Sequence, residues 1–399
     1  MATTDPMVEI GSANERPDGG LLVVLPASPP AEVESILANL AAALPDEDVL
    51  VAVTERPASD PRPNLHFVDL PASKPSWMLR AGDFAHAHQI AQKDHARAIL
   101  ILGQEAGSLR AASLAGLANA VCTGSADLAV PFYELPPRAG LVNSSILYPL
   151  TRALFATQVR FPLAIDLGLS SRMAERLGAA AQRLVALNQS DVPLWAISEA
   201  VVACLRIEEI DAGPRTLPQP AEPDLNSVLP FVTASLFSDI EAKAANWQRP
   251  RVSPPIRRQV PMAPALAGAD GSTEVASMLH GFRLAYTNLR EIWGMVLPPN
   301  AMLGLKRLSS VDGAEFRMPE SLWARIVFDF LIAYRMRTLN RGHLLGALIP
   351  LYLAWVAGHV NAIAAGEDPE RHIELYAAAF EAEKAYLVAR WRWPDRFNP

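Results

Sequence analysis

The sequence contains very little cysteine and no block of one charge sign. Its 399 residues include only Cys122 and Cys204. Both have apolar neighbours, which is typical of small buried residues and not of a disulfide pair or a zinc site. This fits a reducing, cytoplasmic location. Acidic and basic residues are interspersed and sum to a net charge of −7, so no basic field favours binding to nucleic acid.

A secretory leader and a clear membrane span are also missing. Residues 1–20 include four acidic side chains and no continuous apolar stretch, so we expect a loose tail and not a signal peptide. The longest uncharged apolar run, Leu344–Gly358, has about 15 residues, whereas a membrane-spanning helix needs about 20. Pro350 within the run and His359 beside it favour a buried helix of the core.

The chain lacks the short motifs of several enzyme classes. It has no G-x-S-x-G sequence, no Walker loop and no Rossmann glycine fingerprint. Its eight histidines form no zinc signature. His86 and His88 are two positions apart in an expected helix, so their side chains point in different directions.

What the chain does have is an alternation of apolar runs and amphipathic segments. Half of its residues are apolar, which is enough for a substantial core in one large domain or two. Strands are expected at Leu21–Leu25, Val49–Val53, Asn64–Asp69 and Ala98–Leu102, with helices over Ala31–Leu44 and Gly82–Lys93. The alternation predicts an α/β fold with a mainly parallel sheet, whose ligands bind beyond the carboxyl ends of the strands. Segments ending at Pro26, Glu55 and Gly103 should therefore converge.

The second half of the chain differs in character. We expect the α/β domain to cover residues 21–215, a proline-rich connection with loops to cover 216–270, and a helical region to cover 271–399. Helical spacing of apolar residues is found in Val275–Leu297, Pro319–Thr338, Gly342–Ala365 and Pro369–Trp391.

The most informative segment is GLVNSSILYPLTRALF at Gly140–Phe155, which is followed by RFPLAIDLGLS at Arg160–Ser170. Together they resemble the acceptor and catalytic segment of nucleotide-sugar glycosyltransferases related to glucosyl-3-phosphoglycerate synthase and mannosylglycerate synthase. Trp323–Tyr352 resembles the helical carboxyl-terminal part of the same relatives. The resemblance implies an A-type glycosyltransferase fold, Rossmann-like with a mainly parallel sheet, a helical C-terminal extension and a homodimer.

The resemblance also implies site residues. Asp166 is the candidate catalytic residue near the reacting sugar, and Gly140, Asn143 and Ser144 would line an acceptor pocket. Asn143 or Ser144 would at the same time cap a helix over Ser144–Phe155. In the second segment, Arg341, together with Arg335, Arg337 and His343, either presents a basic edge to an anionic acceptor or only pairs with acids and caps helices.

Members of this family bind a divalent cation through a D-x-D sequence and a later histidine. Here Gly103 and Glu105 stand at the two aspartate positions, and Arg215 stands at the histidine. Three interpretations stay open. Arg215 replaces the cation at the diphosphate, so that transfer is metal-independent; the site has decayed; or Mg²⁺ or Mn²⁺ is held by Glu105, water and phosphates.

Three further residues are candidate contacts to the nucleotide sugar. Glu55 follows the second strand and can accept hydrogen bonds from ribose, or it is an ordinary turn residue. Lys74 and Arg80 precede a helix N-terminus and can contact phosphate. The family's P-G-K-G loop is absent there, and its paired glycines before the catalytic acid are Ala164 and Ile165 in this chain, which narrows the donor pocket.

Two functional hypotheses follow. The first is transfer of a hexosyl unit from a nucleotide diphosphate sugar to a small polar or anionic acceptor, such as glycerate, phosphoglycerate or a sugar. The second is a noncatalytic glycosyltransferase-like protein that binds a partner enzyme or senses a ligand, because the metal site and the glycine loops are altered.

Overall fold

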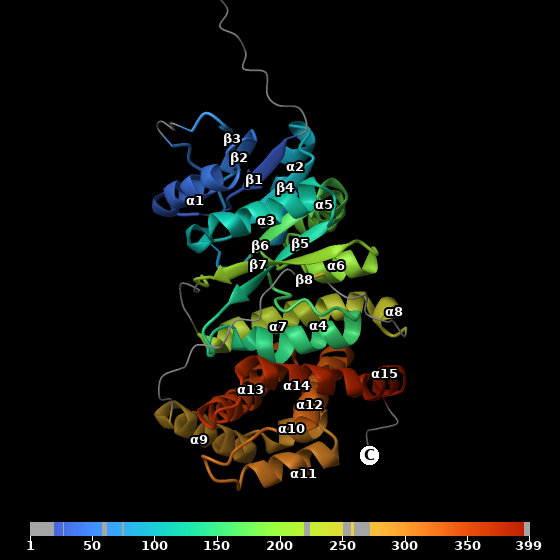
Figure 1. Cartoon of the computed structure of the whole chain (residues 1–399). Helices are drawn as coiled ribbons and strands as arrows, with labels where there is room; N and C mark the ends of the chain where they lie inside the picture. Colours follow the sequence, from blue (N-terminus) through green and yellow to red (C-terminus); the bar gives the residue numbers. More distant parts are fainter. Residues whose placement is uncertain are drawn as a thin grey trace, which may run out of the picture.

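The computed structural model of the chain describes residues 20–26, 28–57, 62–73, 76–218, 224–249, 257–258 and 272–394. Nearly all of the expected N-terminal tail lies outside this range, and so does the candidate ligand contact Lys74. The described residues form an α/β part, which holds the sheet, and a helical part (Figure 1).

The α/β part contains an eight-stranded sheet with the strand order β3-β2-β1-β4-β6-β5-β7-β8. The strands are β1 (Leu21–Val24), β2 (Val49–Val53), β3 (Leu65–Asp69), β4 (Ala98–Leu102), β5 (Leu128–Glu134), β6 (Asp166–Ser170), β7 (Ile207–Pro214) and β8 (Arg257–Arg258). Of these described strands, only β6 is antiparallel to its neighbours, β4 and β5. The mainly parallel α/β class predicted from the sequence is confirmed.

Helices cover both faces of this sheet, which explains why β1 and β4 are apolar throughout. In β1, Leu21 and Val23 pack in one core with α1 (Pro30–Ala43) and α3 (Ala111–Cys122). Leu22 and Val24 pack on the opposite face with α2 (Ala81–Lys93), α5 (Ser171–Ala186) and α6 (Ala196–Val202). A strand that is buried on both faces needs apolar residues at every position and shows no alternation. The strands and helices expected up to Leu102 are confirmed.

The helical part contains the longest described helix, with 24 residues, and most of the buried tryptophans. Its elements are α7 (Leu225–Ala242), α8 (Ala244–Trp247), α9 (Ser272–Asn288), α10 (Arg290–Val296), α11 (Pro299–Leu308), α12 (Glu320–Met336), α13 (Arg341–Ala364), α14 (Pro369–Ala382) and α15 (Lys384–Arg392). Two expected long helices are each divided, at Leu289 and at Glu383. By length and composition α13 is the one described helix able to cross a membrane, but 67% of its apolar window is buried inside the protein.

One expectation for the connection at 216–270 needs correction. Proline in this region predicts loops, but α7 is helical over 18 residues with Pro230 inside it. The buried residues Leu229, Val232, Leu236 and Ile240 all lie on one face of this helix. Their burial outweighs the backbone hydrogen bond that the proline removes.

The two parts share a core and are not separate lobes. Helix α4 (Tyr148–Phe155) and α7 lie between the sheet and the C-terminal helices (Figure 1). Leu150 and Leu154 of α4 belong to the same apolar cluster as Phe328 of α12. The indole nitrogen of Trp323 donates to the main-chain oxygen of Ser145 over 2.8 Å. The segment with the family resemblance is therefore held between both parts.

Candidate functional site

The carboxyl ends of the parallel strands meet at one edge of the sheet. Because β6 runs the other way, its first residue, Asp166, pairs with Leu102 at the end of β4 and lies at this same edge. Tyr133 comes from the end of β5, and Arg215 follows β7 directly. Side chains far apart in the sequence are thus brought together where an α/β sheet binds its ligands.

The centre of this edge is an ion pair between Asp166 and Arg215. Both side chains are fully buried, with 0% exposure each. The Nε atom of Arg215 donates to Oδ2 of Asp166 over 3.0 Å, and Nη2 donates to Oδ1 over 3.2 Å. This two-point geometry is the strongest form of an arginine–carboxylate contact. The structure therefore brings these two residues together, and their predicted roles toward a substrate stay predictions.

Arg215 has no hydrogen-bond donor left for a ligand in this arrangement. Besides the bonds to Asp166, Nη2 donates to the main-chain oxygen of Gln104 over 2.7 Å. Nη1 donates to Ser108 Oγ over 3.1 Å and to the main-chain oxygen of Thr216 over 2.7 Å. A guanidinium group carries five N–H donors, so the protein itself uses all of them.

Asp166 is saturated in the same way. Oδ1 accepts a further hydrogen bond from the Gly103 amide over 3.1 Å, and Oδ2 accepts one from the Tyr133 hydroxyl over 2.9 Å. With the two bonds from Arg215, both carboxylate oxygens have two donors each, which is about their full capacity. Asp166 is positioned as an internal anchor, and in this conformation it faces no open space.

The charges of this cluster stabilise one another. Burial disfavours the charged form of Arg215, but the neighbouring Asp166 outweighs it and raises the arginine pKa. Burial raises the pKa of Tyr133 well above its ordinary value, and Asp166 raises it further. Tyr133 therefore stays protonated and acts as a donor to the carboxylate.

Gly103, at the first D-x-D position, is required by the close approach of β4 and β6. Its amide also donates to the main-chain oxygen of Ile165 over 2.9 Å. A Cβ atom at Gly103 would lie 2.7 Å from that same oxygen. An aspartate therefore does not fit at this position without a backbone shift.

Glu105 stands alone as a carboxylate at the second D-x-D position. Its backbone is in the left-handed helical region, with φ of 61°. Its amide donates to the Glu32 carboxylate over 2.9 Å. Across the described ranges, no three His, Cys, Asp or Glu side chains are grouped so as to hold a metal ion. The two D-x-D positions thus supply a single carboxylate, and a cation held by Glu105, water and phosphates stays a prediction.

The predicted nucleotide contacts differ in placement. Glu55 is exposed just after β2. Arg80 is 9% exposed and pairs with Asp191 over 3.2 Å and with Asp83 over 3.7 Å, so it joins the start of α2 to the segment before α6. Neither placement tests ligand binding, and both contacts stay predictions.

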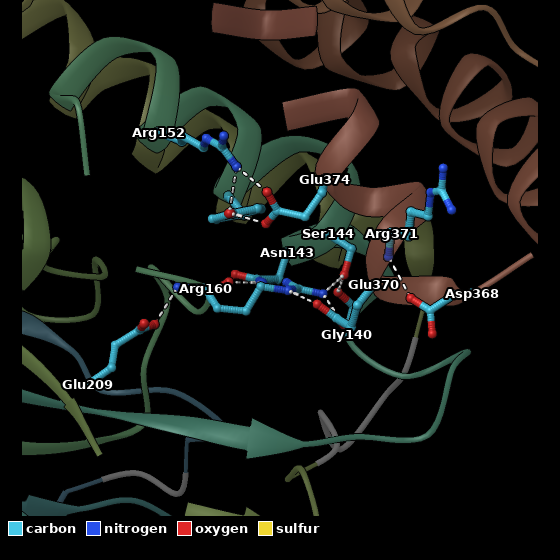
Figure 2. A network of polar contacts seen from close by, with 11 residues as sticks. Gly140, Asn143, Ser144, Arg152, Arg160, Glu209, Asp368, Glu370, Arg371 and Glu374 are labelled. Atoms are coloured by element: carbon cyan, nitrogen blue, oxygen red, sulfur yellow. Dashed lines mark hydrogen bonds and ion pairs between the residues drawn. The ribbon is translucent and has the colours of Figure 1, made fainter. Parts of the chain in front are cut away.

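The predicted acceptor residues are part of a polar network with α14 (Figure 2). Asn143 Nδ2 donates to the main-chain oxygen of Arg160 over 2.9 Å. The Ser144 hydroxyl donates to the Gly140 oxygen over 3.3 Å and accepts from Arg160 Nη2 over 3.0 Å. The expectation that Asn143 or Ser144 caps the helix is wrong. Helical backbone already begins before Asn143 and continues through a π-helical turn at Asn143–Leu147.

One deeply buried charge of this network, Arg160, received no role from sequence reasoning. Its Nε and Nη2 atoms donate to the two carboxylate oxygens of Glu370 over 2.8 and 3.0 Å. The guanidinium carbon lies 5.2 Å from the Tyr148 ring centre and 4.8 Å from that of Phe161. The signal available in the sequence was the arginine of the R-x-P pattern, but its partner lies 210 residues further on.

A second arginine pairs with an acid of α14 in the same way, one turn of that helix after Glu370. Arg152 of α4 pairs with Glu374, which also accepts from the Tyr148 hydroxyl over 2.5 Å. It pairs with Glu381 over 3.1 Å. The stretch Gly140–Ser170 is called the acceptor segment below. Three acids, Glu370, Glu374 and Glu381, thus attach helix α14 to this segment.

Arg341, the fourth predicted acceptor residue, lies elsewhere. It is at the start of α13, where it pairs with Glu241 over 3.2 Å and covers the Tyr334 ring at 3.9 Å. The end of α13 that adjoins the acceptor segment is marked by His359, which contacts the backbone of Pro137. These two positions are about 27 Å apart along the helix, so the structure does not bring Arg341 to Gly140.

Among known proteins, the chain is similar to several solved structures. No protein-family model matches the chain, and no curated protein matches it. Among solved structures it is similar to glucosyl-3-phosphoglycerate synthase from Mycobacterium tuberculosis, crystallised with Mn²⁺, uridine diphosphate and phosphoglyceric acid. The identity is 17% and the TM-score 0.34, over 55% of this chain and 78% of that chain. A putative nucleotide-diphospho-sugar transferase from Desulfovibrio desulfuricans has 8% identity and a TM-score of 0.30, over 57% and 89%.

These structural neighbours are the class of protein that the sequence segment resembles.

Proposed function

We propose that this chain is a noncatalytic glycosyltransferase-like protein, which binds a ligand or a partner and does not transfer a sugar. The observation that supports this proposal is the closed Asp166–Arg215 pair. It fills the position where strand ends converge, and its donors and acceptors are all used within the chain.

Turnover requires groups that face the substrate and stabilise the charge of the leaving diphosphate. To do so here, Arg215 must leave Asp166 and give up its contacts to Gln104, Ser108 and Thr216. Breaking a buried ion pair by removing one partner costs about 3–5 kcal/mol. A pair of this kind is suited to holding the strand ends together, which is a structural task.

A second candidate function is favoured by the place of Arg215. The residue puts a permanent positive charge at the carboxyl edge of the sheet, between the ends of β4 and β7. If a nucleotide diphosphate sugar displaces Asp166 from it, metal-independent transfer of a hexosyl unit to glycerate, phosphoglycerate or a sugar becomes chemically reasonable. Asp166 would then be released toward the sugar.

The two functions are separated by assaying binding and turnover together. Purified protein is titrated in a calorimeter with uridine and guanosine diphosphates and their hexose conjugates, with Mn²⁺ or with chelator, and the same mixtures are analysed for sugar release and transfer. We expect no turnover under either condition. Turnover that the wild type shows and the folded Asp166→Asn variant lacks would refute the noncatalytic proposal and support the second candidate.

A further inference from the structure

The Arg160 site has hydrogen-bonding capacity that the chain does not use. Arg160 is 3% exposed, and its Nη1 atom is buried without a hydrogen-bond partner among the described residues. The Oδ1 atom of Asn143, from the same network, is also buried and unpartnered. Leaving a buried polar group unsatisfied costs about 1–3 kcal/mol, and more when the group is charged. Such groups call for a partner that the free chain lacks.

The present partner of Arg160 is accessible from solvent. The Glu370 side chain is 52% exposed, whereas the Arg160 side chain is 3% exposed. Glu370 therefore approaches the guanidinium from outside and can turn into water, where a carboxylate is well solvated. Because one partner is exposed, the pair contributes little net stability compared with a closed buried pair.

Arg160 itself is held in place independently of Glu370. Its guanidinium lies against the rings of Tyr148 and Phe161. Its amide donates to Glu209 over 2.7 Å, and its main-chain oxygen accepts from Asn143. Figure 2 shows Glu209 at the main-chain end of Arg160, away from Glu370. A fixed guanidinium is a preorganised anion site, because little side-chain entropy is lost when a ligand binds.

We propose that Arg160 is the centre of a binding site for a small oxyanion, a carboxylate or a phosphate group, which Glu370 occupies in the free chain. The ligand displaces Glu370 from the Nε and Nη2 atoms, and the unused Nη1 atom of Arg160 and the Ser144 hydroxyl are the donors available to its remaining oxygens. This inference rests on the proposed binding function and names the chemical class of its ligand.

The position of Glu370 gives ligand binding a structural consequence. The residue lies in the first turn of α14, two positions after the Asp368 cap. Its release removes one attachment of α14 to the acceptor segment, while Arg152 retains Glu374 and Glu381. Occupancy of the site is therefore linked to the mobility of the first turn of α14, as a sensing function requires.

The test compares anion binding in four proteins by calorimetry: wild type, Glu370→Gln, Arg160→Met and Glu381→Gln. The probes are inorganic phosphate, glycerol 3-phosphate and acetate, in chloride at matched ionic strength. We expect Glu370→Gln to bind at least one probe about tenfold more tightly than wild type, because the competing occupant is gone. Glu381→Gln removes an acid of the same helix that does not touch Arg160, so it should bind as wild type does. Arg160→Met should bind no probe.

The preferred probe identifies the source of the oxyanion. Tighter binding of glycerol 3-phosphate than of free phosphate indicates an esterified ligand, and preference for acetate indicates a carboxylate. Equal affinities in wild type and Glu370→Gln, binding retained by Arg160→Met, or an equal gain in Glu381→Gln would each overturn the proposal.

A measurement on the wild type covers the case in which a variant does not fold. Hydrogen exchange of residues 369–374 should become faster when the best-binding probe is added, and exchange in α5 should not change. Unchanged or slower exchange of residues 369–374 would contradict the displacement of Glu370. Neither experiment involves nucleotide sugars, so its outcome is independent of the turnover assay above.

Discussion

Removing either partner of the Asp166–Arg215 pair should destabilise the fold strongly. In Arg215→Met, Asp166 keeps only the Gly103 amide and the Tyr133 hydroxyl as donors. Three further acceptors, on Gln104, Ser108 and Thr216, each lose one hydrogen bond. An uncompensated charge at 0% exposure corresponds to about 3–5 kcal/mol. Asp166→Asn leaves the buried guanidinium unpaired and should cost a similar amount.

The double variant Asp166→Leu plus Arg215→Met provides the matched control. It removes both charges and replaces them with apolar side chains, which for buried pairs is often neutral or stabilising. Urea unfolding of the wild type, Asp166→Leu, Arg215→Met and the double variant, followed by tryptophan fluorescence, gives the four free energies of a double-mutant cycle. We expect single variants to be much less stable than the double variant, with a coupling energy above about 2 kcal/mol.

The same cycle separates a structural pair from a substrate-binding pair. Residues kept for catalysis often cost stability, so their removal leaves a protein equally stable or more stable. Single variants that are as stable as wild type, or effects that simply add, would refute the reasoning that the pair is a structural anchor.

Three further predictions concern other positions. The substitution Gly103→Asp should lower the free energy of unfolding by about 1–3 kcal/mol, because the new Cβ atom would lie 2.7 Å from the main-chain oxygen of Ile165. A variant as stable as wild type in urea unfolding would contradict this contact. Burial raises the pKa of Asp329 from 3.8 to about 7, so the folded state binds the extra proton and this residue's contribution to stability is lost as pH rises from about 4 through 7. Thermal unfolding of Asp329→Asn against wild type should show that slope removed. Burial, with the nearby His372, lowers the pKa of His359 from 6.5 to about 4. The unfolded state therefore binds more protons, and the stability of the fold decreases as pH drops below 6.5. A His359→Gln variant with unchanged acid sensitivity would exclude this residue as the cause.

The extent of sequence prediction differs between the fold and the site. Apolar runs such as those at β1 and β4 determine buried strands, because only apolar side chains satisfy burial on both faces. Periodicity did not reveal α7, since Pro230 normally ends a helix. It also did not reveal the division of the last helices at Glu383, because the break changes no apolar spacing.

The candidate site was predicted in part. The family-like segment identified Asp166, and the altered histidine position identified Arg215. Their direct pairing was not predicted, because the contact joins residues 49 positions apart through the order of strands. Arg341 was grouped with Gly140 by analogy, and the length of α13 separates them. Arg160 was overlooked because its partner is contributed by a helix of the other part.

The sequence by itself determined the class of fold, the strands and helices up to Leu102, most of the C-terminal helical segments and the identity of residues at the sheet edge. These follow from local physics, namely side-chain burial and periodicity along a short stretch of chain. Only the tertiary structure decided what those residues do to one another. Whether an arginine faces a ligand or an internal carboxylate depends on which distant groups reach its donors, and that is fixed by the crossing of strands and the docking of α14. Hydrogen-bond saturation of Arg215, and the unused capacity of Arg160, are therefore properties of the folded chain alone.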